Sequence, residues 1–219
     1  MLKNILKNTI IFLALMLLNC SSKQDCPEGI NLLPMYGEVK KCKEQIESDN
    51  QFLSDCDKLF KTRKEAAEKY VKKAWGYFYN KDPETSMKRF NQAWLLDKNN
   101  AQVYWGFGNL TGMKGKPKES IPLFEKSIKL NPNNPKVYES LATSYGQLFY
   151  ETKNVNHLNS TIDNLKKAIK LDKNNGDLYG KLSNAYAYFM QKDSLRKYIK
   201  IAEGLNSKTI NPEVKRIAN

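Results

Sequence analysis

The chain has 219 residues, of which 41% are hydrophobic and 27% are charged, enough for one or two domains with an apolar core. This composition argues against wholesale disorder and excludes a collagen-like structure. It contains one histidine, His157, which argues against metal cages built from several imidazoles and against most metallo-hydrolase chemistry. Lysine and arginine number 36 against 23 aspartate and glutamate residues, so the chain is strongly basic.

The first 19 residues have the pattern of a secretory signal peptide. Lys3 and Lys7 precede an uninterrupted apolar run over residues 10–18, which matches a basic region followed by a short hydrophobic region. A helix of this run covers about 14 Å, roughly half of the hydrocarbon core of a bilayer. We therefore expect residues 1–19 to direct export and then to be removed, rather than to remain as a transmembrane helix.

Cys20 follows the apolar run, and with Leu17 before it the segment resembles the lipobox of bacterial lipoproteins. The two residues between them depart from that pattern, which usually has small residues there. The resemblance implies that the Cys20 thiol is acylated and becomes the N-terminus, so that acyl chains hold the protein on a membrane. Ser21 implies sorting to the outer membrane if the organism has one, on a face that the pattern does not specify. Residues 20–37 would then form an extended tether.

Three further cysteines, Cys26, Cys42 and Cys56, precede the repeats described below. Apolar residues recur at helical spacing around the last two, so we expect one long helix over residues 38–62 with both thiols on one face. Fourteen helical residues separate these thiols by about 21 Å, well beyond the about 7 Å that a disulfide allows. Cys26 would then pair with Cys42 or with Cys56. A break at residues 48–50 would instead allow a disulfide between Cys42 and Cys56, and a third alternative leaves the thiols reduced and buried.

A repeat of about 34 residues organises the rest of the chain. The phrases WLLDKNN, IKLNPNN and IKLDKNN end at Asn100, Asn134 and Asn175, so their spacings are 34 and 41 residues. A series of tyrosines and a series of small residues recur with the same spacing, and each series has one interval that is seven residues longer than the others. A single insertion within residues 145–168 of the third unit explains all three series. It would either lengthen the helices of that unit or form a protruding loop.

Large and small residues also recur at fixed positions inside each unit, as at Tyr70, Ala74, Phe90 and Ala93 in the first. Through these residues the units resemble tetratricopeptide repeats. The resemblance implies an all-α, right-handed superhelical array in which each unit is a pair of antiparallel helices stacked on the next. Four units fill residues 63–209, at 67–100, 101–134, 135–175 and 176–209. Pro122 falls in the second helix of unit two, where it is tolerated in the first turn and would otherwise bend the helix.

Helix caps are expected between the units and at both ends of the array. Asn100, Asn134 and Asn175, each preceded by a second asparagine, supply helix stops and caps. Residues 210–219 begin with the helix-start signal Asn211, Pro212 and Glu213, so we expect a short helix there that covers the end of unit four. The helix over residues 38–62 would cover unit one.

In tetratricopeptide repeats the first helices of the units line a concave face, and the resemblance assigns candidate groove residues by position. The first half of this groove is aromatic and the second half is polar. The candidates are Trp75, Phe78, Tyr79, Trp105, Asn109, Met113, Asn184 and Tyr188. The aromatic residues would either form a binding patch for a partner or pack on the preceding helix and on one another. A third alternative is that residues 30–37, which are apolar and contain a proline, dock into the groove in cis.

These observations predict a non-catalytic scaffold for protein–protein interactions, exported and held at a bacterial cell envelope by lipid. Its partner would be an envelope protein or peptide, and the alternative is a surface lipoprotein that binds glycans through the aromatic groove. The glycines near residue 110 do not fit a dinucleotide fingerprint or a phosphate-binding loop. We expect no catalytic residues, metal, cofactor or nucleic-acid partner.

Overall fold

The computed structural model describes residues 25–219, and the predicted signal peptide and Cys20 lie outside them. Helix α2 (Lys43–Leu59) comes first and α11 (Pro212–Ala218) comes last. Between them lie four helix pairs: α3 (Arg63–Tyr79) with α4 (Pro83–Leu96), α5 (Ala101–Met113) with α6 (Pro117–Leu130), α7 (Pro135–Thr152) with α8 (Val155–Leu171), and α9 (Gly176–Ala187) with α10 (Lys192–Gly204). The predicted all-α array of four pairs with a helix at each end is confirmed.

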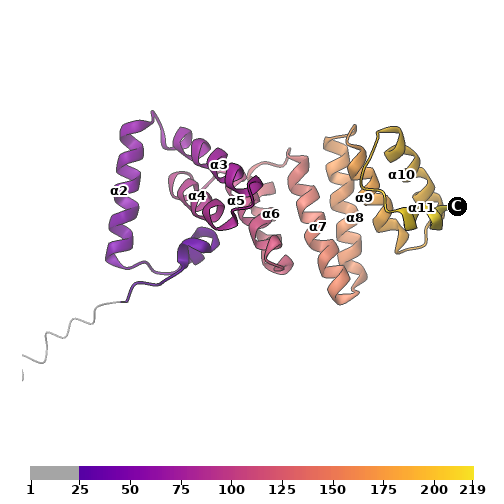
Figure 1. Ribbon diagram of the computed structural model, residues 1–219, viewed down its shortest axis with the longest axis horizontal. Coiled ribbons are helices and arrows are strands. Elements are labelled where there is room, and N and C mark those ends of the chain that lie inside the picture. The colour runs from indigo at the N-terminus through magenta and orange to yellow at the C-terminus, as the bar shows by residue number, and fades with distance from the viewer. Residues whose placement is uncertain (1–24) are drawn as a thin grey trace, which may run out of the picture.

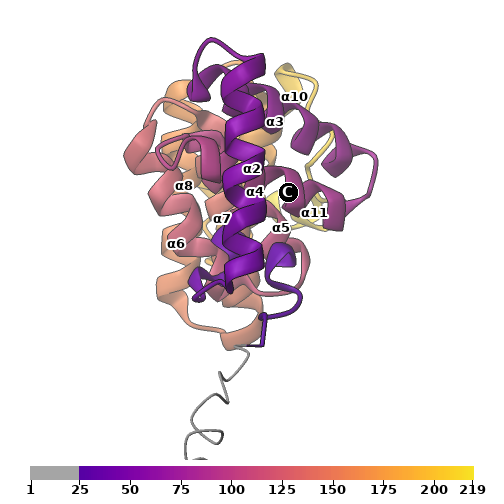
Figure 2. The same cartoon turned by 90° about the vertical axis from the view of Figure 1, so that its left-hand side faces the viewer.

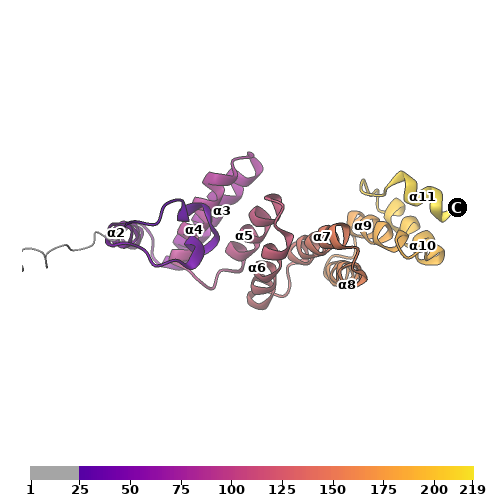
Figure 3. The same ribbon diagram turned by 90° about the horizontal axis from the view of Figure 1, so that it is seen from below.

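The pairs follow one another along the long axis of the molecule in chain order (Figure 1). Seen from the N-terminal end, α2 lies across the front of the first pair and the later pairs extend behind it (Figure 2). Seen from below, α3 and α5 lie obliquely whereas α7 and α8 are nearly end-on, so the helix axes turn from one pair to the next (Figure 3). This progressive turn is how stacked helix pairs form a superhelix.

Small residues let the two helices of each pair approach closely. Ala74 and Ser86 face each other in the first pair and are fully buried, and the Ser86 hydroxyl donates a hydrogen bond of 2.9 Å to the Ala74 carbonyl. Large side chains fill the space between neighbouring pairs, with Phe90, Phe107 and Phe124 almost completely buried. The apolar core therefore runs as a chain of contacts along the array, because each pair covers the open face of the one before.

The insertion in unit three lengthens both helices. Helix α7 has 18 residues and α8 has 17, against 13 and 14 for the equivalent helices of unit two. Only Lys153 and Asn154 connect α7 to α8, so the alternative of a protruding loop is wrong. Pro122 lies just beyond the first turn of α6, where it removes one backbone hydrogen bond, and the helix still continues to Leu130.

Asparagine caps form at two of the three predicted positions. The side chain of Asn100 accepts a hydrogen bond from the Gln102 amide at 3.0 Å, and that of Asn134 accepts one from the Lys136 amide at 3.1 Å. Asn175 stands at the N-cap of α9 but makes no such bond. Its side chain turns to the Asp172 carboxylate at 3.2 Å instead.

The first helix is shorter than the predicted span of residues 38–62, because the chain enters it through a turn. Met35, Tyr36 and Glu38 all have positive φ angles, a conformation that helices do not contain. The helix begins after Cys42, where the Gln45 side chain accepts a hydrogen bond from the Cys42 amide. It is continuous to Leu59, so the hairpin alternative with a break at residues 48–50 is also wrong.

The segment before this helix is compact, so the expectation of an extended tether is wrong for residues 25–37. Two 3-10 turns, η2 (Ile30–Leu32) and η3 (Pro34–Glu38), pack against α4. Asn91 of α4 is fully buried and holds them through three hydrogen bonds. Its amide nitrogen donates to the carbonyls of Asn31 at 2.9 Å and Leu33 at 2.8 Å, and its oxygen accepts from the Tyr36 amide at 3.3 Å.

Of the alternatives for the cysteines, the structure contains the disulfide between Cys26 and Cys42, whose Cα atoms lie 5.0 Å apart. Cys56 is a free thiol buried between α2 and the first pair, with Ala66, Ala67 and Leu96 around it. Burial raises the pKa of this thiol. The disulfide thus closes the N-terminal segment onto the start of α2, while Cys56 acts as a small apolar residue.

Candidate functional site

An aromatic cluster occupies the first half of the concave face. The Trp75 ring lies at its centre, 4.4 Å from the Trp105 ring and 5.2 Å from the Phe78 ring, measured between centroids. Tyr79 stacks on Trp75 at 5.9 Å and is 67% exposed. The rings thus pack on one another, as one of the two alternatives expected, and the Tyr79 ring stays largely exposed.

A pocket of about 320 Å³ opens beside this cluster, across the first helices of units two and three. Tyr79 and Trp105 form its aromatic side, and Met113 lies at its edge with 64% of its surface exposed. The other lining residues are polar or small: Gly108, Asn109, Gly112, Lys136, Glu139, Ser140, Thr143, Ser144, Gln147 and Lys181, together with Phe124. We call this hollow the concave pocket.

Hydrogen bonds fix the polar wall of the concave pocket. The Trp105 indole donates to the Ser140 hydroxyl at 3.0 Å, and that hydroxyl donates to the Asn109 side-chain oxygen at 3.3 Å. The Asn109 amide nitrogen in turn donates to the Trp105 carbonyl at 2.8 Å. This closed network ties α5 to α7 and holds the Trp105 ring in one orientation, so the pocket is formed before a ligand arrives.

The charges in the concave pocket are unbalanced. Lys181 of unit four pairs with Glu139 of unit three, and both side chains are partly exposed. Lys136 also lines the pocket and forms no ion pair within residues 25–219. One positive charge is thus left for a ligand, which favours a group carrying a carboxylate.

Asn184 does not stand open in the groove, contrary to the prediction. Residues 207–211, which precede α11, run along the concave side of α9 and cover it. The Asn184 amide nitrogen donates to the Thr209 carbonyl at 2.9 Å, and its oxygen accepts from the Asn211 amide at 3.1 Å. Gly180 is needed below this segment, because a Cβ there would lie 2.5 Å from the Thr209 hydroxyl oxygen. We call residues 207–211 the C-terminal strap.

Comparison with known proteins gives matches only among solved structures: no family model matches the chain, and no curated protein matches it in sequence. The crystal structure of MamA aligns with a TM-score of 0.56 at 18% identity, over 77% of this chain and 96% of that one. TTC0263, a thermophilic TPR protein of Thermus thermophilus, aligns with a TM-score of 0.56 at 13% identity, over 69% of this chain and 79% of that one. YrrB, a TPR protein with an unusual peptide-binding site, aligns with a TM-score of 0.51 at 16% identity, over 74% of this chain and 80% of that one.

The chain has the tetratricopeptide repeat fold. At these identities the alignments establish the architecture alone, because one fold serves many functions. None of the helices within residues 25–219 has both the length and the apolar character needed to cross a membrane.

The TPR array brings some of the predicted groove residues together and separates others. Trp75, Phe78, Tyr79, Trp105, Asn109 and Met113 gather at units one and two. Tyr188 lies apart, at the end of α9, where its ring packs edge-on against Phe149 at 5.0 Å. Ser140 and Lys181 were missed, although both stand at the sixth position of a first helix. Their equivalence to each other in the repeat is the signal that could have found them.

The N-terminal segment does not occupy the concave pocket. Residues 30–37 dock in cis, but mainly on the second helix of unit one, with one further hydrogen bond of 3.3 Å from Lys114, at the end of α5, to the Leu32 carbonyl. Within residues 25–219, the N-terminal segment therefore leaves the TPR groove between units two and three uncovered. Its lining contains none of residues 30–37.

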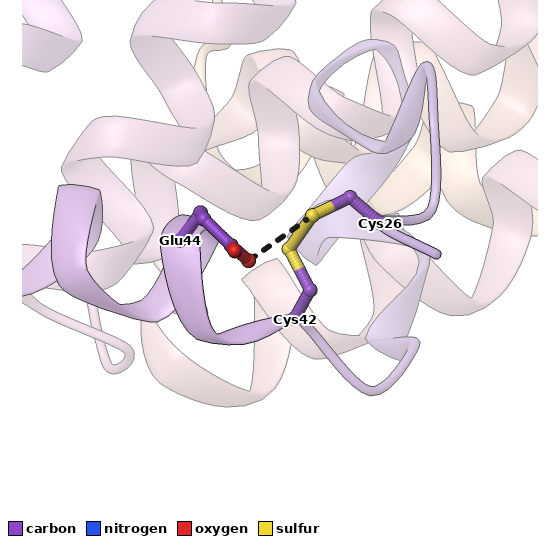
Figure 4. Close-up of side chains that lie close together, drawn as sticks. All are labelled: Cys26, Cys42 and Glu44. Atoms are coloured by element: carbon purple, nitrogen blue, oxygen red, sulfur yellow. Dashed lines mark hydrogen bonds between the residues drawn. A yellow bond between two sulfur atoms is a disulfide. The ribbon is translucent and has the colours of Figure 1, made fainter. Parts of the chain in front are cut away.

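Cys26, Cys42 and Glu44 form the one group of potential metal ligands within the described residues (Figure 4). A Glu44 carboxylate oxygen lies 3.5 Å from the Cys26 sulfur. Because the two sulfurs are bonded to each other, neither is a thiolate, and thiolates are what a metal ion would need. The cluster is a structural crosslink beside a carboxylate.

The C-terminal strap should loosen in acid. Its backbone at Lys208 donates a hydrogen bond of 2.8 Å to Asp177, and this bond, with a second from Ser207, holds the pKa of the Asp177 carboxyl below its usual value. Because the Asp177 pKa is lower in the folded protein than in the unfolded chain, the ionised carboxylate stabilises the fold at pH values above the ordinary carboxyl pKa. This stabilisation is lost as the pH falls through the lowered pKa of the folded state. We expect the protection of the Lys208 amide, which is its exchange rate compared with that of an unstructured amide at the same pH, to fall below about pH 4. NMR-detected exchange should show no such pH dependence in Asp177→Asn; a retained acid transition there would contradict this assignment.

Proposed function

We propose that the protein is a non-catalytic interaction scaffold whose concave pocket binds an extended segment of another protein. The observation that carries this proposal is the preorganised pocket beside Tyr79 and Trp105, with one unpaired lysine. Large rigid aromatic rings supply contact area at a low entropic cost, and the lysine would pair with an acidic side chain or a C-terminal carboxylate. The peptide-binding site of YrrB supports the same use of this fold.

The C-terminal strap supports the proposal from within the molecule. Asn184, at the ninth position of the first helix of unit four, binds the backbone of the C-terminal strap through both the nitrogen and the oxygen of its amide group. Asn109 occupies the equivalent position in unit two and lines the concave pocket. The same face of the array thus already holds one segment of the chain, at unit four. Because the Asn109 amide is itself bonded to Trp105 and Ser140, a second segment would meet Tyr79 and Lys136 at the pocket.

The test starts from a peptide selected from a displayed linear library against the purified chain. Tyr79→Ala should weaken its binding by at least about 30-fold, which corresponds to about 2 kcal/mol for a central aromatic contact. Tyr150→Ala is the matched control, because Tyr150 is similarly exposed and lies outside the pocket. Equal affinity of the wild type and Tyr79→Ala, or an equal loss in the control, would refute the proposal.

Glycan binding is the second candidate, and the exposed face of Tyr79 favours it because sugar rings stack on aromatic faces. A glycan array separates the two candidates. If a glycan binds the wild type but not Tyr79→Ala, and no peptide binds at the same site, glycan binding would replace the peptide proposal.

We further propose that the scaffold is exported and anchored by lipid on Cys20 at a bacterial outer membrane. The signal-like residues 1–19 and the lipobox-like sequence at Cys20 support this location. Metabolic labelling with a palmitate analogue should mark the wild type, and Cys20→Ala should lose the label. Equal labelling of the two proteins would overturn the anchor.

A further inference from the structure

A second hollow, unrelated to the concave pocket, lies at the N-terminal end of the molecule. Its volume is about 900 Å³, and we call it the N-terminal cavity. Helix α2 provides one wall and α4 the facing wall, while residues 25–31 and Tyr36 form the remaining side. Figure 1 shows α2 beside the first helix pair, with the N-terminal segment at the lower end of both.

The position of these walls is fixed by two constraints already described. The disulfide joins residue 26 to the start of α2, and Asn91 clamps the 3-10 turns onto α4. The Gln45 side chain adds a hydrogen bond of 2.7 Å to the Pro27 carbonyl. The walls of this open hollow are thus held in place by covalent and hydrogen-bonded contacts, as a preformed binding site requires.

The α4 wall carries two cations that the protein leaves unpaired. Arg89 makes one side-chain hydrogen bond, from Nη1 to the Gln92 oxygen at 2.7 Å. Its Nε is buried and has no partner within the described residues. Lys88 also lines the cavity and forms no ion pair there. Because Nε is closed off from the cavity, a ligand there would reach Arg89 only through its terminal guanidinium nitrogens, and Lys88 through its ammonium group.

The other charges of the cavity do not neutralise this pair. Lys41 is bound to Asp49, so those two cancel each other. Asp25 and Glu28 lie on the exposed N-terminal segment, where water screens them, and neither forms an ion pair with the α4 wall. Phe52 and Leu95 give the cavity an apolar part. The site thus combines a guanidinium, an ammonium and an apolar surface.

We propose that the N-terminal cavity binds a phosphate ester, with Arg89 and Lys88 holding the phosphate and Phe52 and Leu95 contacting its organic part. A guanidinium fork and a neighbouring ammonium together match the oxygens of a phosphate group. A soluble ester and the headgroup of an anionic phospholipid share this chemistry, and the experiment below distinguishes the two sources.

The first arm titrates sn-glycerol 3-phosphate into the full chain and follows the Arg89 Nε–H signal by NMR. We expect that signal to shift and to saturate with a Kd of about 1 mM or tighter. The second arm measures flotation with phosphatidylglycerol vesicles. Saturation in the first arm identifies a soluble ester, and binding in the second arm alone identifies the lipid headgroup.

Arg89→Gln should weaken the observed binding at least tenfold, and Lys72→Gln should leave it unchanged. Lys72 is the matched control, because it is exposed on α3 and does not line the cavity. If Arg89→Gln fails to fold, the half-buried Lys88→Gln replaces it, with the same expected loss. Absence of binding in both arms at about 10 mM probe, or equal binding by wild type and the cavity variant, would overturn the proposal.

Discussion

Asn91→Ala should lower the free energy of unfolding by about 2–4 kcal/mol, because it removes three hydrogen bonds from one fully buried side chain. The carbonyls of Asn31 and Leu33 and the amide of Tyr36 would lose their partner together. Since these groups lie about 55–60 residues away in sequence, the substitution also releases the N-terminal segment from α4.

Urea denaturation measures the loss, and hydrogen exchange over residues 30–37 shows whether the segment is released. Asn99→Ala is the matched control, because Asn99 is exposed and its side chain makes no hydrogen bond within the described residues. The control should change stability by less than about 0.5 kcal/mol. If Asn91→Ala behaves like Asn99→Ala, the clamp on the N-terminal segment has been assigned wrongly.

Gly106→Ala should destabilise the array by about 1–3 kcal/mol, because α5 approaches α4 too closely for a side chain at this position. An added Cβ would lie 2.2 Å from the Phe90 ring, which is completely buried and cannot move into solvent. The ring also packs edge-on against Trp75, so a displacement of Phe90 would reach the aromatic cluster.

Gly76→Ala provides the comparison for this prediction. Gly76 also lies inside a helix, but a Cβ there meets nothing within 4 Å, so alanine should stabilise the protein by about 0.5–1 kcal/mol. Calorimetry should therefore place the melting temperature of Gly106→Ala below that of the wild type and that of Gly76→Ala at or above it. The opposite order would mean that the first two units pack differently.

The repeat array could be predicted because its information is local and recurs. Small residues such as Ala74 and Ser86 mark where two helices touch, and Asn100 and Asn134 mark where the next unit begins. The same markers located the insertion in unit three. Whether it lengthened the helices could not be read in the same way, because a loop and two longer helices require the same number of residues.

The two ends of the array were less predictable, since both depend on contacts across long distances in the chain. Residues 35–38 have left-handed backbone angles, and Asn91, far along the sequence, stabilises the turn that they form. Asn184 has the residue type and repeat position of a groove residue, yet the C-terminal strap covers it. Repeat position identifies a face of the helix, but it does not reveal which other segment lies on that face.

Two methionines test the central claim, that a partner binds at the concave pocket. Met113 lines the pocket and is 64% exposed, while Met190 is 63% exposed and lies outside it. With methyl-labelled methionines, the selected peptide should shift the Met113 signal in proportion to saturation and leave the Met190 signal in place. An unmoved Met113 signal at saturating peptide would contradict the account.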